Sequence, residues 1–308
     1  MSLTIRAGRH AVEIPRPDKP LFPDGTTKAD LARYYERAAE AMLSHVGGHP
    51  LNLERYPDGV ERPGIFQQRA GAHFPNWIGR VRVPKRGGSV EHVVADQAAT
   101  LVYLAGQACV TPHAWLSRRD RLERPDRIIF DLDPSEGGSA DVLVAARTIG
   151  ELLRDLELRA WPMTSGSRGY HLMVPLQRRA DFDTVRRFTH AVAELAAWRE
   201  PRLFTVEQRK AKREGRILID VLRNAYAHTA VAPYAVRARA NAPVATPLHW
   251  EELSDSKLRP DSFTLREVPT RLEQEGDAWR DVSAHAQTLT RPRRLLQRAL
   301  EEAGVGSA

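Results

Sequence analysis

The chain has 308 residues, of which 42% are hydrophobic and 28% are charged, so it can bury the core of one large domain or of two closely packed lobes. Its longest mainly apolar stretch, 98–110, is interrupted by Gly106 and Gln107 and is shorter than the roughly 20 residues of a membrane span. A net charge of +7 suits a polyanionic partner, and a single cysteine, Cys109, excludes an internal disulfide and a cysteine-cluster metal site. Because residues 1–17 lack the apolar core of a signal peptide, we expect a cytoplasmic location without membrane association.

The first part of the chain is predicted to alternate helices with turns and short strands. Apolar residues recur at helical spacing over 27–46, where Thr27 is the predicted N-cap and Asp30 gives a weaker form of the capping box. A turn-rich segment at 55–64 precedes strands and loops at 65–84, and a second helix is expected at 96–108.

The middle of the chain has the pattern of an α/β protein. A strand at 127–131 is followed by a Gly-rich turn at 134–141 and a helix at 142–156. Two short strands, a helix and a further buried strand follow, at 159–165, 169–176, 181–198 and 216–222. The polar sequence after Leu248 predicts irregular structure and short helices, and no linker divides the chain.

Two carboxylates, Asp131 and Asp133, end the apolar run "RIIFDLDP". Residues i and i+2 of a strand point to the same face, so both acids can share a pair of divalent metal ions about 3.5 to 4 Å apart. The alternative is a strand end at which Asp133 and Pro134 form a turn and Asp131 accepts backbone hydrogen bonds. A third acid, Asp220, ends the apolar strand "RILIDVL", where an unpaired carboxylate would be costly to bury.

Between these acids lies the segment "TSGSRGYH", which has the composition of an anion-binding turn. Small residues let backbone N–H groups approach a phosphate, while Ser165, Arg168 and His171 supply a hydroxyl and positive charge. The segment is therefore a candidate cradle for a triphosphate. The alternative is a flexible Ser/Gly turn followed by an ordinary half-buried histidine.

In this order, the three motifs resemble those of the archaeo-eukaryotic primase superfamily, and within it the polymerase domain of bacterial ligase D. The resemblance extends over nearly the whole chain through "PDKPLFPDGTTKADLARYY", "RYPDGVERPGIFQQ", "PHAWLSR" and "ILIDVLRNAYAHTAVAPYAVRARANAPVATPLHW". It implies an α/β (α+β) primase-polymerase fold, with central, mostly antiparallel or mixed β-sheets flanked by helices. We expect one catalytic domain over 1–308, comprising a DNA-binding part (1–95), the core motifs (96–250) and a helical or irregular end (251–308).

The resemblance also implies a role for each matching residue. Asp131, Asp133 and Asp220 would bind the metal ions, with His113 near the metals and the nucleotide sugar. Nucleotide contacts would come from Phe66, Ser165, Arg168, His171, Arg223 and Arg237, and the 5′-phosphate of a DNA gap would be bound by Lys19 and Lys28. Taken singly, both lysines and the segment "EQRKAKREGR" could instead be solvated charges. Gln68 and Arg168 stand where the family has lysines.

The implied function is template-directed nucleotidyl transfer, with a preference for ribonucleotides, that fills gaps and extends ends in bacterial non-homologous end joining. It would use nucleoside triphosphates and two Mn²⁺ or Mg²⁺ ions, on gapped or broken DNA with a 5′-phosphate, alongside Ku and an ATP-dependent DNA ligase near the nucleoid. The alternatives are a primase, a DNA-end-binding module without catalysis and a haloacid-dehalogenase-type phosphatase, which Pro134 and the distant Asp220 fit poorly. Residues 54–62 resemble a nucleotide-ligase motif but lack its nucleophilic lysine, so no ligase activity is expected.

Overall fold

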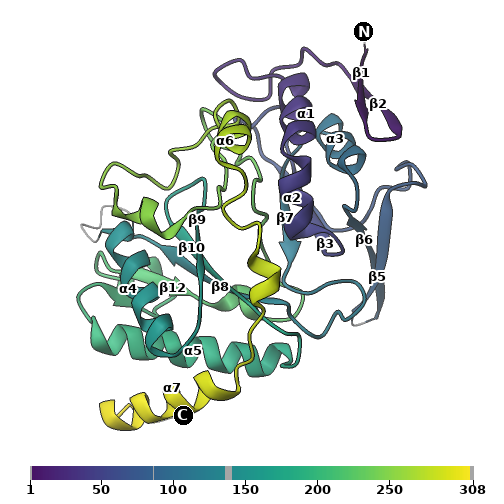
Figure 1. Ribbon diagram of the computed structural model, residues 1–308. Coiled ribbons are helices and arrows are strands. Elements are labelled where there is room, and N and C mark those ends of the chain that lie inside the picture. The colour runs from purple at the N-terminus through teal and green to yellow at the C-terminus, as the bar shows by residue number, and fades with distance from the viewer. Residues whose placement is uncertain (1, 86, 136–140, 306–308) are drawn as a thin grey trace. The chain divides into compact units, whose positions relative to one another are not determined.

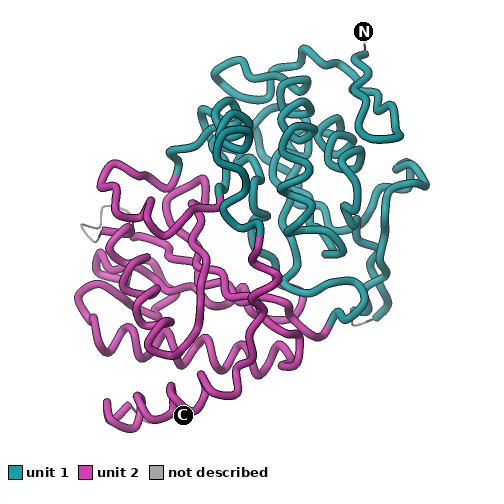
Figure 2. The backbone as a smooth tube through the Cα atoms, in the orientation of Figure 1, with its two compact units in different colours: residues 1–122, 229–246, 261–280 teal, residues 123–228, 247–260, 281–308 magenta. Residues whose placement is uncertain are grey.

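A computed structural model describes residues 2–85, 87–135 and 141–305 (Figure 1). Two compact units are apparent, each assembled from three stretches of the chain (Figure 2). Unit 1 comprises 1–122, 229–246 and 261–280, and unit 2 comprises 123–228, 247–260 and 281–308. The single catalytic domain expected over 1–308 stays a prediction. No helix in the described ranges is long and apolar enough to cross a membrane.

Unit 1 is built on an antiparallel sheet with the strand order β13-β7-β3-β6-β5, in which β4 also pairs with β3. A separate hairpin joins β1 to β2. The strands are β1 (Ser2–Ala7), β2 (His10–Pro15), β3 (Pro50–Arg55), β4 (Ile65–Gln67), β5 (Gly79–Lys85), β6 (Gly88–Val94), β7 (Cys109–Trp115) and β13 (Thr229–Val231). The helices are α1 (Lys28–Arg37), α2 (Ala39–Val46), α3 (Ala98–Gly106) and α6 (Val268–Glu275).

The helix predicted over 27–46 is present as two helices, α1 and α2, with a break at Ala38. The capping box is confirmed, because Thr27 accepts the N–H of Asp30 and the Asp30 carboxylate accepts the N–H of Thr27. At Ala38 the ψ angle is −4°, which departs from helical geometry and ends the first helix. The buried Tyr35 joins α1 to the sheet by donating its hydroxyl to the Val110 carbonyl at 2.6 Å.

Unit 2 contains a sheet with the strand order β11-β12-β8-β10-β9, which is antiparallel except between β11 and β12. Its strands are β8 (Arg127–Asp133), β9 (Trp161–Thr164), β10 (Tyr170–Pro175), β11 (Phe204–Thr205) and β12 (Ile217–Asp220). Its helices are α4 (Val142–Asp155), α5 (Phe182–Arg199) and α7 (Thr290–Ala303). Short 3-10 helices occupy Lys210–Lys212, Leu222–Asn224 and Trp250–Ser254 in this unit, with a fourth at Val282–His285. The α/β class and the mostly antiparallel sheets are thus confirmed.

Two strands of unit 2 end differently from their predicted boundaries. β8 continues to Asp133 because its ladder with β12 pairs Asp133 with Leu218. β12 is shorter than predicted, since the Asp220 carboxylate accepts the N–H of Leu222 and the chain then turns into a 3-10 helix. Of the Gly-rich turn predicted at 134–141, residues 136–140 lie outside the described residues.

Candidate active site

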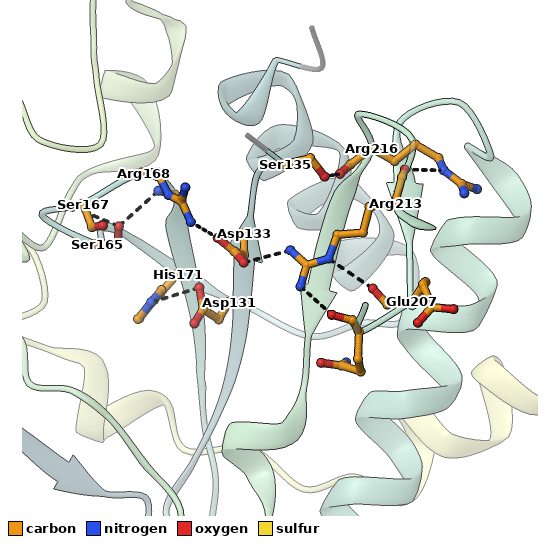
Figure 3. Close-up of polar contacts among 12 residues, drawn as sticks. Asp131, Asp133, Ser135, Ser165, Ser167, Arg168, His171, Glu207, Arg213 and Arg216 are labelled. Carbon is orange, nitrogen blue, oxygen red and sulfur yellow. Dashed lines mark hydrogen bonds and ion pairs between the residues drawn. The ribbon is translucent and has the colours of Figure 1, made fainter. Parts of the chain in front are cut away.

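A row of polar side chains crosses three adjacent strands of unit 2. Asp220 of β12 is the direct partner of Asp131 on β8, and Asp131 is in turn the direct partner of His171 on β10. Direct cross-strand partners share a face of a sheet, and so do Asp131 and Asp133, two residues apart on one strand. The sheet therefore brings the three predicted metal ligands and His171 to one face, as Figure 3 shows for Asp131, Asp133 and His171.

Each carboxylate of this row has cationic or N–H partners. His171 Nε2 lies 3.3 Å from Asp131 Oδ1, and Arg223 Nε lies 3.6 Å from Asp131 Oδ2. Asp133 has an arginine on each oxygen, with Arg213 Nη1 2.9 Å from Oδ2 and Arg168 Nη2 3.6 Å from Oδ1. Asp133 is thus part of an ion-pair cluster rather than a cap on a turn.

The pKa of Asp220 is raised above its usual value, mainly by burial, and the negative charges of Asp131 and Asp133 raise it further. The N–H of Leu222 and the Arg223 guanidinium partly oppose the rise. This strand end therefore concentrates negative charge that a cation can relieve. Within the described ranges, no group of three or more His, Cys, Asp or Glu side chains forms a ready-made metal site, since these acids face arginine, histidine and backbone partners.

The predicted phosphate cradle is an ordered turn between β9 and β10. Ser165 is buried, and its Oγ accepts the N–H groups of Ser167 at 3.2 Å and Gly169 at 3.1 Å. Gly166 has φ +61°, a conformation that favours glycine. His171 is also buried, and its Nδ1 has no hydrogen-bond partner. An unsatisfied buried nitrogen beside the acidic row is consistent with a site for an absent ligand.

Sequence reasoning missed Arg213. It lies in "EQRKAKREGR", a segment whose charges can be solvated in an exposed loop, and residues 208–212 are indeed exposed. Arg213 itself is buried and donates to Asp133. Charge density alone could not separate it from its neighbours, although its position seven residues before Asp220 places it close to the third acid in sequence.

The remaining predicted residues lie in unit 1. His113 contacts Glu54, a residue that sequence reasoning also missed, and Phe66 is the cross-strand partner of Glu54. Glu54 Oε2 lies 3.1 Å from His113 Nε2, and its Oε1 accepts the Tyr56 hydroxyl at 2.6 Å. The exposed Phe66 packs edge-on against the His113 ring. Burial alone would raise the pKa of Glu54, but the hydrogen bonds from His113 and Tyr56, with the charges of His113 and Arg237, lower it to about 2.

The two lysines predicted to bind a 5′-phosphate are neighbours. The N–H of Lys28 donates to the Lys19 carbonyl at 3.0 Å, and Lys28 Nζ donates to the Pro15 carbonyl at 2.9 Å. Lys28 is buried, so the alternative of a solvated charge is wrong for this residue. Burial lowers the pKa of Lys28, and the nearby charges of Arg16, Lys19 and Arg55 lower it further. Unit 1 thus contains a cluster of positive charge.

Gln68, which stands where the family has a lysine, is exposed.

Comparison with known proteins gives one consistent result. The family model "LigD, primase-polymerase domain" matches residues 27–279. The multifunctional non-homologous end joining DNA repair protein LigD of Mycobacterium tuberculosis is 35% identical over 302 residues, covering 94% of this chain and 40% of that protein. The bifunctional non-homologous end joining protein LigD of Bacillus subtilis is 30% identical over 264 residues, covering 84% of this chain and 42% of that protein.

A solved structure agrees with these sequence matches. The polymerase domain of Mycobacterium tuberculosis ligase D, in complex with DNA, superposes with a TM-score of 0.82 at 33% identity and covers 89% of this chain and 98% of that one. The chain spans about two fifths of the length of the curated relatives. The phosphatase alternative is set aside by these matches. With three acids on one face of a sheet and these relatives in agreement, the chain belongs to the LigD primase-polymerase domain family, a family of nucleotidyltransferases.

Proposed function

We propose that this protein extends DNA 3′ ends by template-directed nucleotidyl transfer, preferring ribonucleotides, at gaps and breaks during non-homologous end joining. The observation that carries the proposal is the arrangement of Asp131, Asp133 and Asp220 on one face of β8 and β12, beside the turn at 165–169. Oxygen ligands on a rigid sheet suit the metal-assisted chemistry of phosphoryl and nucleotidyl transfer.

The donor set fits divalent cations such as Mn²⁺ or Mg²⁺. These are hard cations that prefer carboxylate oxygens, and such an ion would offset both the burial of Asp220, which is the main cause of its raised pKa, and the negative charges of Asp131 and Asp133 beside it. Asp131, Asp133 and Asp220 would hold two ions, which when bound supply charge neutralisation and lower the pKa of the attacking hydroxyl. The contacts of Arg168 and Arg223 with these acids, both at 3.6 Å, are long enough to be exchanged for an ion.

The other predicted residues would bind and orient the nucleotide. In unit 2, Ser165, Arg168, His171 and Arg223 would contact the phosphates, and the partnerless Nδ1 of His171 supports this role. In unit 1 we assign nucleotide contacts to Phe66, His113 and Arg237, and the 5′-phosphate contact to Lys19 and Lys28. Because the relatives are named as non-homologous end joining proteins, we further propose Ku and an ATP-dependent DNA ligase as partners, in the cytoplasm near the nucleoid.

The test is extension of a labelled primer across a short gap with a downstream 5′-phosphate, using Mn²⁺ and either ribonucleotides or deoxyribonucleotides. Asp131→Asn keeps the shape of the side chain and removes one charge, and we expect it to lower incorporation by about 10³-fold or more. Asp155→Asn, which removes an exposed carboxylate paired with Arg199, is the matched control and should retain full activity.

Three results would change the proposal in different ways. Gap binding by the wild type without incorporation would support the DNA-end-binding module instead. Synthesis that starts without a primer would add a primase activity. Equal loss in Asp155→Asn and Asp131→Asn would show that the assay reports charge or folding rather than the acidic row.

A further inference from the structure

Arg213 is held by three hydrogen bonds from its guanidinium group. Its side chain is only 5% exposed. Nη1 donates to Asp133 Oδ2 at 2.9 Å, Nε to the Glu207 carbonyl at 3.2 Å and Nη2 to the Gln208 carbonyl at 3.0 Å (Figure 3). A planar guanidinium bound at all three nitrogens has one orientation, so its position fixes Asp133 Oδ2 as well.

The two oxygens of Asp133 are therefore held unequally. Oδ2 accepts a charge-assisted hydrogen bond from the buried Arg213, whereas Oδ1 lies 3.6 Å from Arg168, whose side chain is 36% exposed. The first contact has hydrogen-bond geometry and little access to water, while the second is a looser ion pair at the surface. Only Oδ1 can change its partner without exposing a buried charge.

The loop that carries Arg213 has anchors of its own. The Arg213 N–H donates to the Lys210 carbonyl at 3.1 Å, and Arg216 Nε donates to the Arg213 carbonyl at 2.9 Å. Ser135, just after β8, donates its hydroxyl to the Arg216 carbonyl at 2.6 Å. The Ser135 contact holds the end of the loop beside β8 whatever side chain is present at 213, whereas a substitution there removes both the contact with Asp133 and the donors to the Glu207 and Gln208 carbonyls.

We propose that Arg213 is a positioning residue that fixes Oδ2 of Asp133 and thereby turns Oδ1 toward a divalent cation. The inference rests on the proposed metal site. Groups that hydrogen-bond a metal ligand orient it, and their loss commonly weakens metal binding by about 10-fold to 100-fold. If Arg213 acted only through its positive charge, its loss would change the Mn²⁺ affinity in the opposite direction. Removing a cation from beside the site would strengthen the binding of Mn²⁺.

The experiment measures Mn²⁺ binding to the full chain by electron paramagnetic resonance, which needs no nucleotide or DNA. Arg213→Met should weaken binding about 10-fold or more. Arg213→Lys keeps the charge but presents a point donor in place of a fork, and should weaken it by a smaller factor. Arg209→Met removes a positive charge from an exposed position of the same loop and should change binding by less than about twofold.

Each outcome decides between the inference and the proposed function on which it rests. Unchanged or tighter Mn²⁺ binding in both Arg213 variants would overturn the positioning role. If Arg213→Met lowers the melting temperature strongly, Arg213→Lys alone decides the question. Asp133→Asn is the reference variant. If it binds Mn²⁺ as the wild type does, the proposed metal site itself is wrong, whereas its failure to bind beside normal binding in every folded Arg213 variant overturns only the inference.

Discussion

In both units a side chain of one charge holds a predicted site residue of the other kind. In unit 2 the arginine Arg213 holds the acid Asp133, and in unit 1 the carboxylate Glu54 holds the histidine His113. In unit 2, Asp133 is 31% exposed and is held by the buried Arg213, which is 5% exposed. In unit 1, His113 and its carboxylate partner Glu54 are both partly open to water, at 17% and 26%. The orienting partner is thus part of the interior in unit 2 and close to the surface in unit 1. We therefore expect substitutions in the first region to have larger effects than those in the second.

The largest expected effect comes from Gly169, in the turn next to the acidic row. A Cβ at this position would overlap the carbonyl oxygen of Leu132, which is backbone of β8 and lies between the two aspartates in sequence. Gly169→Ala must push β8 and β10 apart, and we expect it to lower the free energy of unfolding by about 3 kcal/mol or more and to abolish nucleotide incorporation. Urea unfolding monitored by circular dichroism, together with the gap-filling assay, measures both effects.

Gly8→Ala is the matched control in unit 1. Gly8 has φ +58°, but no atom lies within 4 Å of the added Cβ, so the expected loss is only about 1 kcal/mol. Similar losses in the two variants would mean that the turn at 165–169 can relax, and that the proposed rigidity of the acidic row is wrong.

An intermediate effect is expected from Glu54→Gln, which keeps one of the two acceptor oxygens, places an amide NH₂ opposite either His113 or Tyr56, and removes the negative charge. The weaker hydrogen bond should loosen the His113 ring and lower kcat/KM for nucleotide incorporation by about 10-fold. Tyr56→Phe leaves the contact between Glu54 and His113 in place and should cause a smaller loss. Steady-state kinetics on the gapped primer measures both variants.

The pH dependence provides a second test of Glu54. With its pKa lowered to about 2, Glu54 stays ionised above that pH. Its contribution to stability is present above the unfolded-state pKa of about 4.3 and is lost as the pH falls toward 2. The pH profile of wild-type activity between about 5 and 9 should therefore contain no step due to Glu54, and a step that disappears in Glu54→Gln would contradict this assignment.

Sequence periodicity was sufficient to predict that the three acids share a face of a sheet, but not to predict which side chains hold the site residues in place. Asp131 and Asp133 share a face because strands repeat every two residues, and Asp220 follows an apolar run that had to be a strand. Arg213 and Glu54 became visible only in three dimensions, because each belongs to a polar segment and meets a partner 80 and 59 residues away, respectively. The helix break at Ala38 could not be predicted either, because no glycine or proline stands at or near this position.

The smallest expected effect comes from Lys28→Met, because one phosphate contact contributes little to the binding of a whole DNA end. We expect the preference for a gap with a 5′-phosphate over one with a 5′-hydroxyl to fall by about 3-fold to 10-fold, and the salt slope of log K to fall by about 1. Fluorescence anisotropy with the two gapped duplexes measures both quantities. Arg33→Met removes an exposed charge from the same helix, α1, and should leave the preference intact.

Burial and the charges of Arg16, Lys19 and Arg55 lower the pKa of Lys28. The wild-type preference should therefore decline with rising pH at a lower pH than it would if Lys28 had the pKa of a free lysine. An equal reduction of the preference in Lys28→Met and Arg33→Met would show that general positive charge, rather than the buried lysine, recognises the DNA end.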